Sequence, residues 1–229
     1  MTLILYQHPF ASYCQKALIA LHELGLPFES HLVEGDREEL ARLWPMAAIP
    51  VLRDDDAGLV LPESTTIIEY LDALAPGGPA LVPPDAGAAL QARLWDRFAD
   101  QHLATPMQKI VGDRLRPAGR EDPEGVAEAR RRLDIAYAVL DARLAERPWA
   151  GGETFTLADC AAFPVLFYTR AIHRWDVGVH GNITRYHRDL LSRASVARVV
   201  EEARPYRHVF PLPWPADQDE LEPSKERSE

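Results

Sequence analysis

Hydrophobic positions follow a mixed strand and helix pattern in the first third of the chain. Short apolar runs predict four strands, at residues 3–6, 28–33, 50–52 and 59–61. Apolar residues at helical spacing predict three helices, over residues 12–24, 36–43 and 64–74. Asp36 is the expected cap of the second helix. The order of these elements predicts a βαβαββα unit over residues 1–78.

From residue 85 onward the pattern is helical throughout. The spacing predicts helices over residues 86–111, 124–145, 183–193 and 195–203, and another directly after Thr156. We expect Pro106 to kink the first of them. Thr156 and Asp159 have the Ser/Thr-x-x-acid spacing of a capping box, in front of a long apolar run. Residues 85–210 are therefore expected to form an all-helical bundle.

Turn-forming residues separate the two parts. The stretch 76–84 contains Pro-Gly-Gly-Pro and Pro-Pro, which cannot continue a helix or a central strand. The charge balance changes at the same place: residues 1–80 hold four basic and twelve acidic side chains, and residues 81–215 hold 19 and 17. Residues 211–229 are expected to form a tail that begins with an ordered apolar anchor and ends acidic and disordered.

Composition excludes several classes of function for these 229 residues. A net charge of −10 argues against a nucleic-acid partner, because phosphate binding needs clustered Lys and Arg. No apolar run approaches the roughly 18 residues of a membrane span, and the N-terminus lacks a signal-peptide pattern. Cys14 and Cys160 are too few for a disulfide framework. We expect a cytoplasmic globular protein with no metal and no membrane partner.

Four motifs in order resemble the glutathione S-transferase family, in its bacterial-type, Ser/Cys-like branch. They are Tyr6-Gln7-His8-Pro9 before the first helix, Ile49-Pro50-Val51-Leu52, the Glu-Ser…Ile…Tyr-Leu stretch 62–71, and Phe155-Thr156-Leu157-Ala158-Asp159. The resemblance covers about residues 1–210. It implies a thioredoxin-like glutathione-binding domain over residues 1–78 and an all-helical substrate-binding domain over residues 85–210. It also implies a homodimer that uses glutathione as co-substrate and takes a small apolar electrophile.

Such a transferase must convert the glutathione thiol into a thiolate. A helix N-terminus favours the anion through its free N–H groups and its dipole, and a Ser or Tyr hydroxyl supplies a further hydrogen bond in this family. Ser12, at the start of the first helix, is our candidate for that hydroxyl, although Ala11 stands where the family pattern has its reactive Ser or Cys. An ordinary helix cap is the alternative for Ser12. Tyr6, at the end of the first strand, is a second donor candidate.

Two other functions remain open. Cys14 could form a mixed disulfide with glutathione, which would make the protein a glutathione-dependent disulfide reductase or peroxidase. A buried structural cysteine is the competing interpretation of Cys14. The third possibility is a glutathione-binding homologue without catalysis, which Ala11 and Ala48 suggest, because Ala48 replaces the family's lysine for the glycyl carboxylate.

The resemblance implies roles for further residues. Ser64 would bind the γ-glutamyl carboxylate and Glu63 the ammonium, at a helix N-terminus. Ile49, before an expected cis Pro50, would pair through its backbone with the cysteinyl part. Arg42 or Arg53 could meet the glycyl carboxylate in place of the missing lysine. The expected lining of the electrophile pocket is Phe10, Trp95, Met107 and Ile110.

Overall fold

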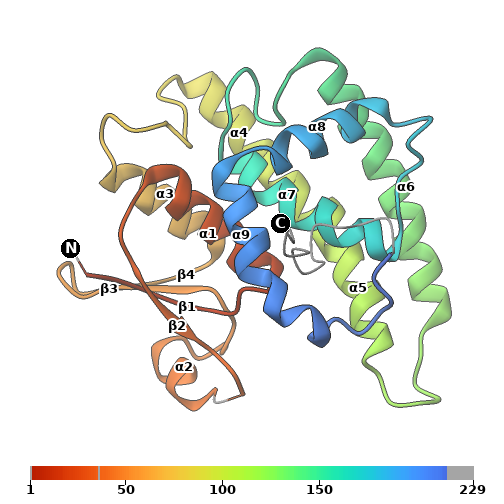
Figure 1. Ribbon diagram of the computed structural model, residues 1–229, viewed down its shortest axis with the longest axis horizontal. Coiled ribbons are helices and arrows are strands. Elements are labelled where there is room, and N and C mark those ends of the chain that lie inside the picture. Colours follow the sequence, from red (N-terminus) through yellow and green to blue (C-terminus); the bar gives the residue numbers. More distant parts are fainter. Residues whose placement is uncertain (1, 36, 216–229) are drawn as a thin grey trace, which may run out of the picture.

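The computed structural model describes residues 2–35 and 37–215, in which a small sheet with its helices lies beside a larger helical part (Figure 1). The four strands are β1 (Leu3–Gln7), β2 (Glu29–Leu32), β3 (Val51–Asp54) and β4 (Leu59–Pro62). Their order in the sheet is β2-β1-β3-β4. β2 runs parallel to β1, whereas β3 is antiparallel to both β1 and β4. The thioredoxin-like architecture predicted for this part is confirmed.

Three helices cover the two faces of this sheet: α1 (Ser12–Leu24), α2 (Glu38–Leu43) and α3 (Ser64–Leu74). Successive strand residues face opposite sides. Leu5 of β1 joins the core that α1 and α3 share, while its neighbour Tyr6 packs with Leu40 of α2. α2 begins at Glu38, and its predicted cap, Asp36, lies outside the described residues. α1 and α3 therefore bury one face of the sheet and α2 covers the other (Figure 1).

The second part consists of helices packed around α7. They are α4 (Ala86–Phe98), the π-helical η1 (Ala99–Ala104), α5 (Thr105–Arg114), α6 (Pro123–Glu146), α7 (Leu157–Ile172), α8 (Gly181–Leu191), α9 (Ala194–Ala203) and the 3₁₀-helical η2 (Arg204–Val209). Every residue from Leu157 to Thr169 is buried, which places α7 at the centre of the molecule. None of the helices in the described part of the chain combines the length and the apolar character needed to cross a bilayer.

The helix predicted over residues 86–111 has a different form in the structure. It is divided into α4, η1 and α5, and the irregular segment precedes Pro106. Proline lacks an N–H, and its ring clashes with the carbonyl one turn earlier in an α-helix. The wider π-helical turns of η1 accommodate the missing N–H and the ring of Pro106. Pro106 therefore lies in the first turn of α5 rather than at a kink within one helix.

The predicted capping box is confirmed at the start of α7. Thr156 Oγ1 accepts a hydrogen bond from the backbone of α7, and Asp159 accepts one from the Thr156 N–H at 2.8 Å. The buried Asp159 carboxylate also accepts from the Ala150 N–H at 2.9 Å and from the Tyr186 hydroxyl at 2.5 Å. Burial raises the pKa of Asp159 to about 6, against the opposing effect of these donors. One carboxylate thus ties α7 to the preceding loop and to α8.

The segment between the two parts is anchored at Leu81. This side chain is buried, its N–H donates to Asp72 at 2.7 Å, and its carbonyl accepts from the Leu157 N–H at 3.0 Å. One continuous core includes residues from both parts, among them Leu18 of α1 and Leu166 of α7. The domain limits at residues 78 and 85 stay predictions.

Candidate functional site

A cleft of about 520 Å³ opens where the two parts of the molecule meet. Its lining consists of Tyr13, Trp44, Ala48, Ile49, Pro50, Glu63, Ser64, Thr65, Thr66, Arg97, Asp100, Gln101 and Thr105. The residues predicted to bind glutathione, in the pairs Ile49-Pro50 and Glu63-Ser64, are all among them. The sequence motifs that contain these pairs therefore converge on a single cleft.

The turn before β3 carries a cis peptide bond between Ile49 and Pro50. This isomer was expected from the resemblance and is confirmed. The strand ladder starts at the next residue, where Val51 pairs with Tyr6 of β1 and with Pro62 of β4. The backbone of Ile49 thus lies at the cleft, just outside the sheet, where an extended peptide can pair with it.

The N-terminus of α3 supplies an anion-binding wall. Ser64, Thr65 and Thr66 form its first turn, and their backbone N–H groups have no carbonyl partner within the helix. The positive end of the helix dipole adds to the attraction for a carboxylate. Glu63 precedes this turn with φ of 67°, a conformation that few residues other than glycine adopt. Backbone strain of this kind concentrates at functional sites.

The helical part forms the opposite wall of the cleft, through residues that the sequence patterns did not indicate. Arg97, Asp100, Gln101 and Thr105 come from α4, η1 and α5. The sequence does contain one signal for this wall. Asp96 and Asp100 are four residues apart on a helix face whose other members are small and apolar, and buried carboxylates require a partner.

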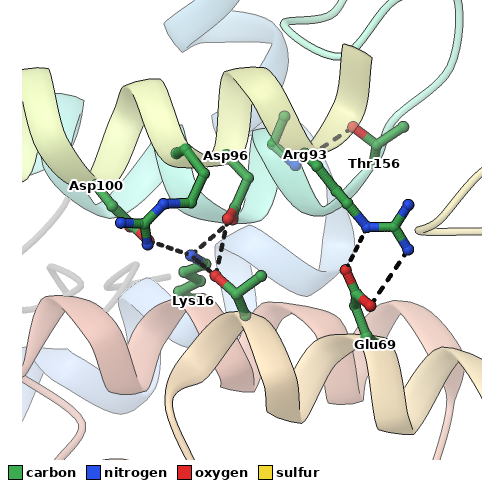
Figure 2. Close-up of polar contacts among 9 residues, drawn as sticks. Lys16, Glu69, Arg93, Asp96, Asp100 and Thr156 are labelled. Carbon is green, nitrogen blue, oxygen red and sulfur yellow. Dashed lines mark hydrogen bonds and ion pairs between the residues drawn. The ribbon is translucent and has the colours of Figure 1, made fainter. Parts of the chain in front are cut away.

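That partner is Lys16 of α1, which is also buried (Figure 2). Its Nζ lies 2.6 Å from Asp96 Oδ1 and 3.0 Å from Asp100 Oδ2. It also donates to Thr65 Oγ1 at 2.8 Å, and the Thr65 hydroxyl in turn donates to Asp96 Oδ2 at 2.8 Å. Burial raises the pKa of Asp96, while Lys16 acts in the opposite direction. The cluster joins α1, α3 and α4 behind the wall of the cleft.

A second, more apolar cavity of about 340 Å³ lies at the start of α1. It is lined by Phe10, Ser12, Met107, Gln108, Val111, Gly112, Leu115, Tyr168, Val209, Phe210 and Pro211. Ala11 is the N-cap of α1 and no side chain caps this helix, so Ser12 does not serve as a side-chain cap. The loop before Ser12 is fixed by the Tyr168 hydroxyl, which donates to the Phe10 carbonyl at 2.8 Å.

Two of the four residues predicted for the electrophile pocket lie elsewhere. Phe10 and Met107 line the apolar cavity, whereas Trp95 and Ile110 do not. Trp95 packs beneath the guanidinium of Arg143, which lies 5.3 Å from its ring centroid. Ile110 is buried in the main core. Apolar residues at helical spacing face the core as readily as a pocket, and the pattern alone does not distinguish the two.

The alternative donor Tyr6 lies on the α2 face of the sheet. Its hydroxyl donates to Glu39 at 3.2 Å and accepts from Arg53 at 2.9 Å. Arg53 also forms an ion pair with Asp55 at 2.7 Å. Neither Tyr6 nor Arg53 lines the cleft, and Arg42 does not line it either.

Cys14 is completely buried inside α1. Burial raises the pKa of its thiol to about 12, so Cys14 stays protonated at neutral pH. The thiolate is the reactive form of cysteine, and Cys14 therefore has the character of a core residue.

Tyr13 is the hydroxyl-bearing residue of α1 that lines the cleft. Burial, with a smaller contribution from the Asp100 carboxylate, raises the pKa of Tyr13 to about 12 and keeps its phenol protonated.

Comparison with known proteins identifies relatives along most of the chain. The family described as "Glutathione S-transferase, N-terminal domain" matches residues 5–79, and "Glutathione S-transferase, C-terminal domain" matches residues 123–189. Glutathione S-transferase GstB of Escherichia coli strain K12 is 30% identical over 197 residues, which cover 81% of this chain and 91% of that protein. A stringent starvation protein A homolog of Coxiella burnetii is 32% identical over 178 residues, covering 77% of this chain and 78% of the relative.

A solved structure agrees with these matches. The crystal structure of a glutathione S-transferase from Methylobacillus flagellatus KT with glutathione bound superposes with a TM-score of 0.79 at 27% identity. The match covers 86% of this chain and 98% of the other. Sequence motifs, fold and relatives thus agree, and the chain belongs to the glutathione S-transferase family.

Proposed function

We propose that the protein is a glutathione transferase that conjugates glutathione to a small apolar electrophile. The observation that carries this proposal is the position of the first turn of α1. Its consecutive residues Ser12 and Tyr13 line the apolar cavity and the polar cleft respectively. A sulfur at this helix N-terminus would lie between a peptide held in the cleft and an electrophile held in the cavity.

The cleft supports an extended orientation of glutathione. The γ-glutamyl carboxylate accepts hydrogen bonds from Ser64 and the first N–H groups of α3, and Glu63 receives the ammonium group. The cysteinyl part pairs with the backbone of Ile49. This orientation directs the thiol toward the N-terminus of α1.

Ser12 and the helix N-terminus activate the thiol by favouring its anion. The Ser12 hydroxyl donates a hydrogen bond to the sulfur, and the helix dipole acts in the same direction. The thiol proton leaves to solvent, and a sulfur lone pair forms the new carbon–sulfur bond. The electron pair of the broken bond departs with the leaving group of the electrophile. The cleft and the cavity hold the sulfur and the electrophile close together, and this proximity supplies the remaining rate enhancement.

The charge distribution supports this binding mode. Glutathione is a net anion, yet the α/β part holds four basic residues and none of them lines the cleft. Helix N-termini and backbone groups must then provide most of the attraction. Arg97 of α4 is the basic residue in the lining of the cleft, and its side chain is more than half exposed.

Glutathione binding tests the proposal directly. Isothermal titration calorimetry should detect binding to the full chain at millimolar glutathione, and Ser64→Ala should weaken it about tenfold through loss of a hydrogen bond to a charged group. Ser192→Ala, at the end of α8 and outside the cleft, is the matched control. Absence of binding to the unmodified protein would exclude both the transferase and a reductase.

Two alternative functions make different predictions for the same protein. A disulfide reductase or peroxidase that uses Cys14 requires a reactive thiolate, which the burial of Cys14 does not favour. A non-catalytic homologue, which Ala11 and Ala48 favour, would bind glutathione but form no conjugate. A reductase or peroxidase would also bind glutathione without conjugating it, so calorimetry, a conjugation assay and a glutathione-dependent disulfide-reduction assay together separate these three functions.

The homodimer implied by the resemblance is proposed to cover an apolar surface on α4 and α6. The side chains left exposed there are Leu90, Leu94, Ile135 and Val139. Exposed apolar surface of this kind marks interaction sites. Light scattering after size-exclusion chromatography should give twice the chain mass of 25.7 kDa. The mass of a single chain at micromolar concentration would contradict the dimer.

A further inference from the structure

A buried lysine joins the three helices behind the wall of the cleft. The Lys16 side chain of α1 is 1% exposed, and its ammonium group contacts Thr65 of α3, Asp96 of α4 and Asp100 of η1 (Figure 2). The ammonium group donates hydrogen bonds to Thr65 and Asp100 and forms an ion pair with Asp96. Lys16 itself does not line the cleft.

Two of these three partners do line the cleft. Thr65 and Asp100 are lining residues, and Asp96 is not. The Thr65 hydroxyl accepts from Lys16 and donates to Asp96, which fixes its orientation from behind. Thr65 follows Ser64 in the first turn of α3, the turn proposed to bind the γ-glutamyl carboxylate. Lys16 therefore holds that turn against α4.

The backbone around Asp100 is also specialised. Asp100 lies in η1, the π-helical segment of the described chain, and its carbonyl accepts from the Thr105 hydroxyl at 3.1 Å. π-Helical turns are rare and occur frequently at functional sites. The wider turn rotates the residues that follow relative to an α-helix, and Asp100, Gln101 and Thr105 all line the cleft.

Resting on the proposed function, we propose that Lys16 is a positioning residue for the γ-glutamyl end of the thiol substrate. It holds Thr65 and Asp100 in the cleft wall without touching the substrate. Removal of its ammonium group breaks the contact from α1 to Thr65 of α3 and leaves Asp96 and Asp100, which lie on one continuous helical segment, without their shared cation. The first turn of α3 is then no longer held against α4. A thiol that lacks the γ-glutamyl group does not contact this wall and does not depend on Lys16.

The test compares Lys16→Met with a matched control at the same helix pair. Arg93 of α4 pairs with Glu69 of α3 at 2.6 Å, but both side chains are exposed and neither lines the cleft (Figure 2). Conjugation to chlorodinitrobenzene is measured with glutathione and with cysteinylglycine, which has no γ-glutamyl group. Lys16→Met should raise KM for glutathione about tenfold with kcat within about twofold, and kcat/KM for cysteinylglycine should stay within about twofold. Arg93→Met should leave kcat and KM unchanged with both glutathione and cysteinylglycine.

A merely structural role for Lys16 gives a different result. Equal loss of kcat/KM with both thiols, or an unchanged KM for glutathione, would overturn the inference. If circular dichroism shows that Lys16→Met does not fold, the double variant Lys16→Met/Asp96→Asn is measured with the same expectations, because it removes the Lys16–Asp96 ion pair as a unit and still leaves Thr65 without its Lys16 donor. Failure of the unmodified protein to bind glutathione would remove the proposed function, whereas binding that Lys16→Met leaves unaltered would remove only the role of Lys16.

Discussion

Replacing Ser12 with alanine should lower kcat/KM for conjugation of glutathione to chlorodinitrobenzene by about 10²–10³, the typical cost of removing one preorganised donor to a reacting anion. Ser12 lies in the first turn of α1, at the edge of the apolar cavity, and no side chain caps that helix. Its removal leaves the helix dipole in place, so part of the thiolate stabilisation persists. Binding of glutathione should change little, because the peptide is held by α3 and Ile49.

The pKa of bound glutathione separates this role of Ser12 from a structural one. The thiolate absorbance of the protein–glutathione complex should titrate at a higher pH in Ser12→Ala than in the unmodified protein, and Ser12→Thr should restore the lower value. Tyr6→Phe and Cys14→Ala are the matched controls, since neither residue lines the cleft or the cavity. Full activity of Ser12→Ala, or loss of activity in Cys14→Ala alone, would contradict the assignment.

The elements that the sequence predicted well are those with local causes. α1 was predicted with the bounds that it has, because its apolar spacing is regular and Gly25, with φ of 63°, ends it. The capping box at Thr156 and Asp159 needs only residues three apart. The cis bond before Pro50 followed from the family resemblance and not from the residues alone.

Tertiary packing, and not a local sequence pattern, brings together the residues of the opposite wall of the cleft. This explains why the sequence did not predict that wall. Arg97 and Asp100 reach the cleft because α4 packs across α1 and α3, and Lys16 meets its carboxylates from 80 and 84 residues away. Trp95, Met107 and Ile110 all belong to the apolar pattern of the helix predicted over residues 86–111, yet of these three only Met107 borders the cavity. Periodicity identifies the buried face of a helix, but the tertiary packing decides which part of that face meets a cavity.

Replacing Asp159 with asparagine should lower the free energy of unfolding by about 3–5 kcal/mol, measured by urea denaturation. The Asp159 carboxylate is buried and accepts hydrogen bonds from the N–H groups of Ala150 and Thr156 and from the hydroxyls of Thr156 and Tyr186. An asparagine amide offers one acceptor oxygen and turns an NH₂ group toward the remaining donors, which leaves buried polar groups without partners. Asp189→Asn, at an exposed ion pair, should cost less than about 0.5 kcal/mol.

The difference in unfolding free energy between the unmodified protein and Asp159→Asn should also depend on pH. The pKa of Asp159 is about 6 in the folded protein, above the value of about 3.9 for an unfolded chain. The folded state therefore holds the proton more tightly, so the contribution of Asp159 is fully present below about pH 4 and decreases as pH rises through 6. Taking the difference between the two proteins cancels the titration of all other groups. A difference that grows between pH 4 and pH 7 would show that the carboxylate is stabilised as an anion by its four donors, and that desolvation does not dominate at this site.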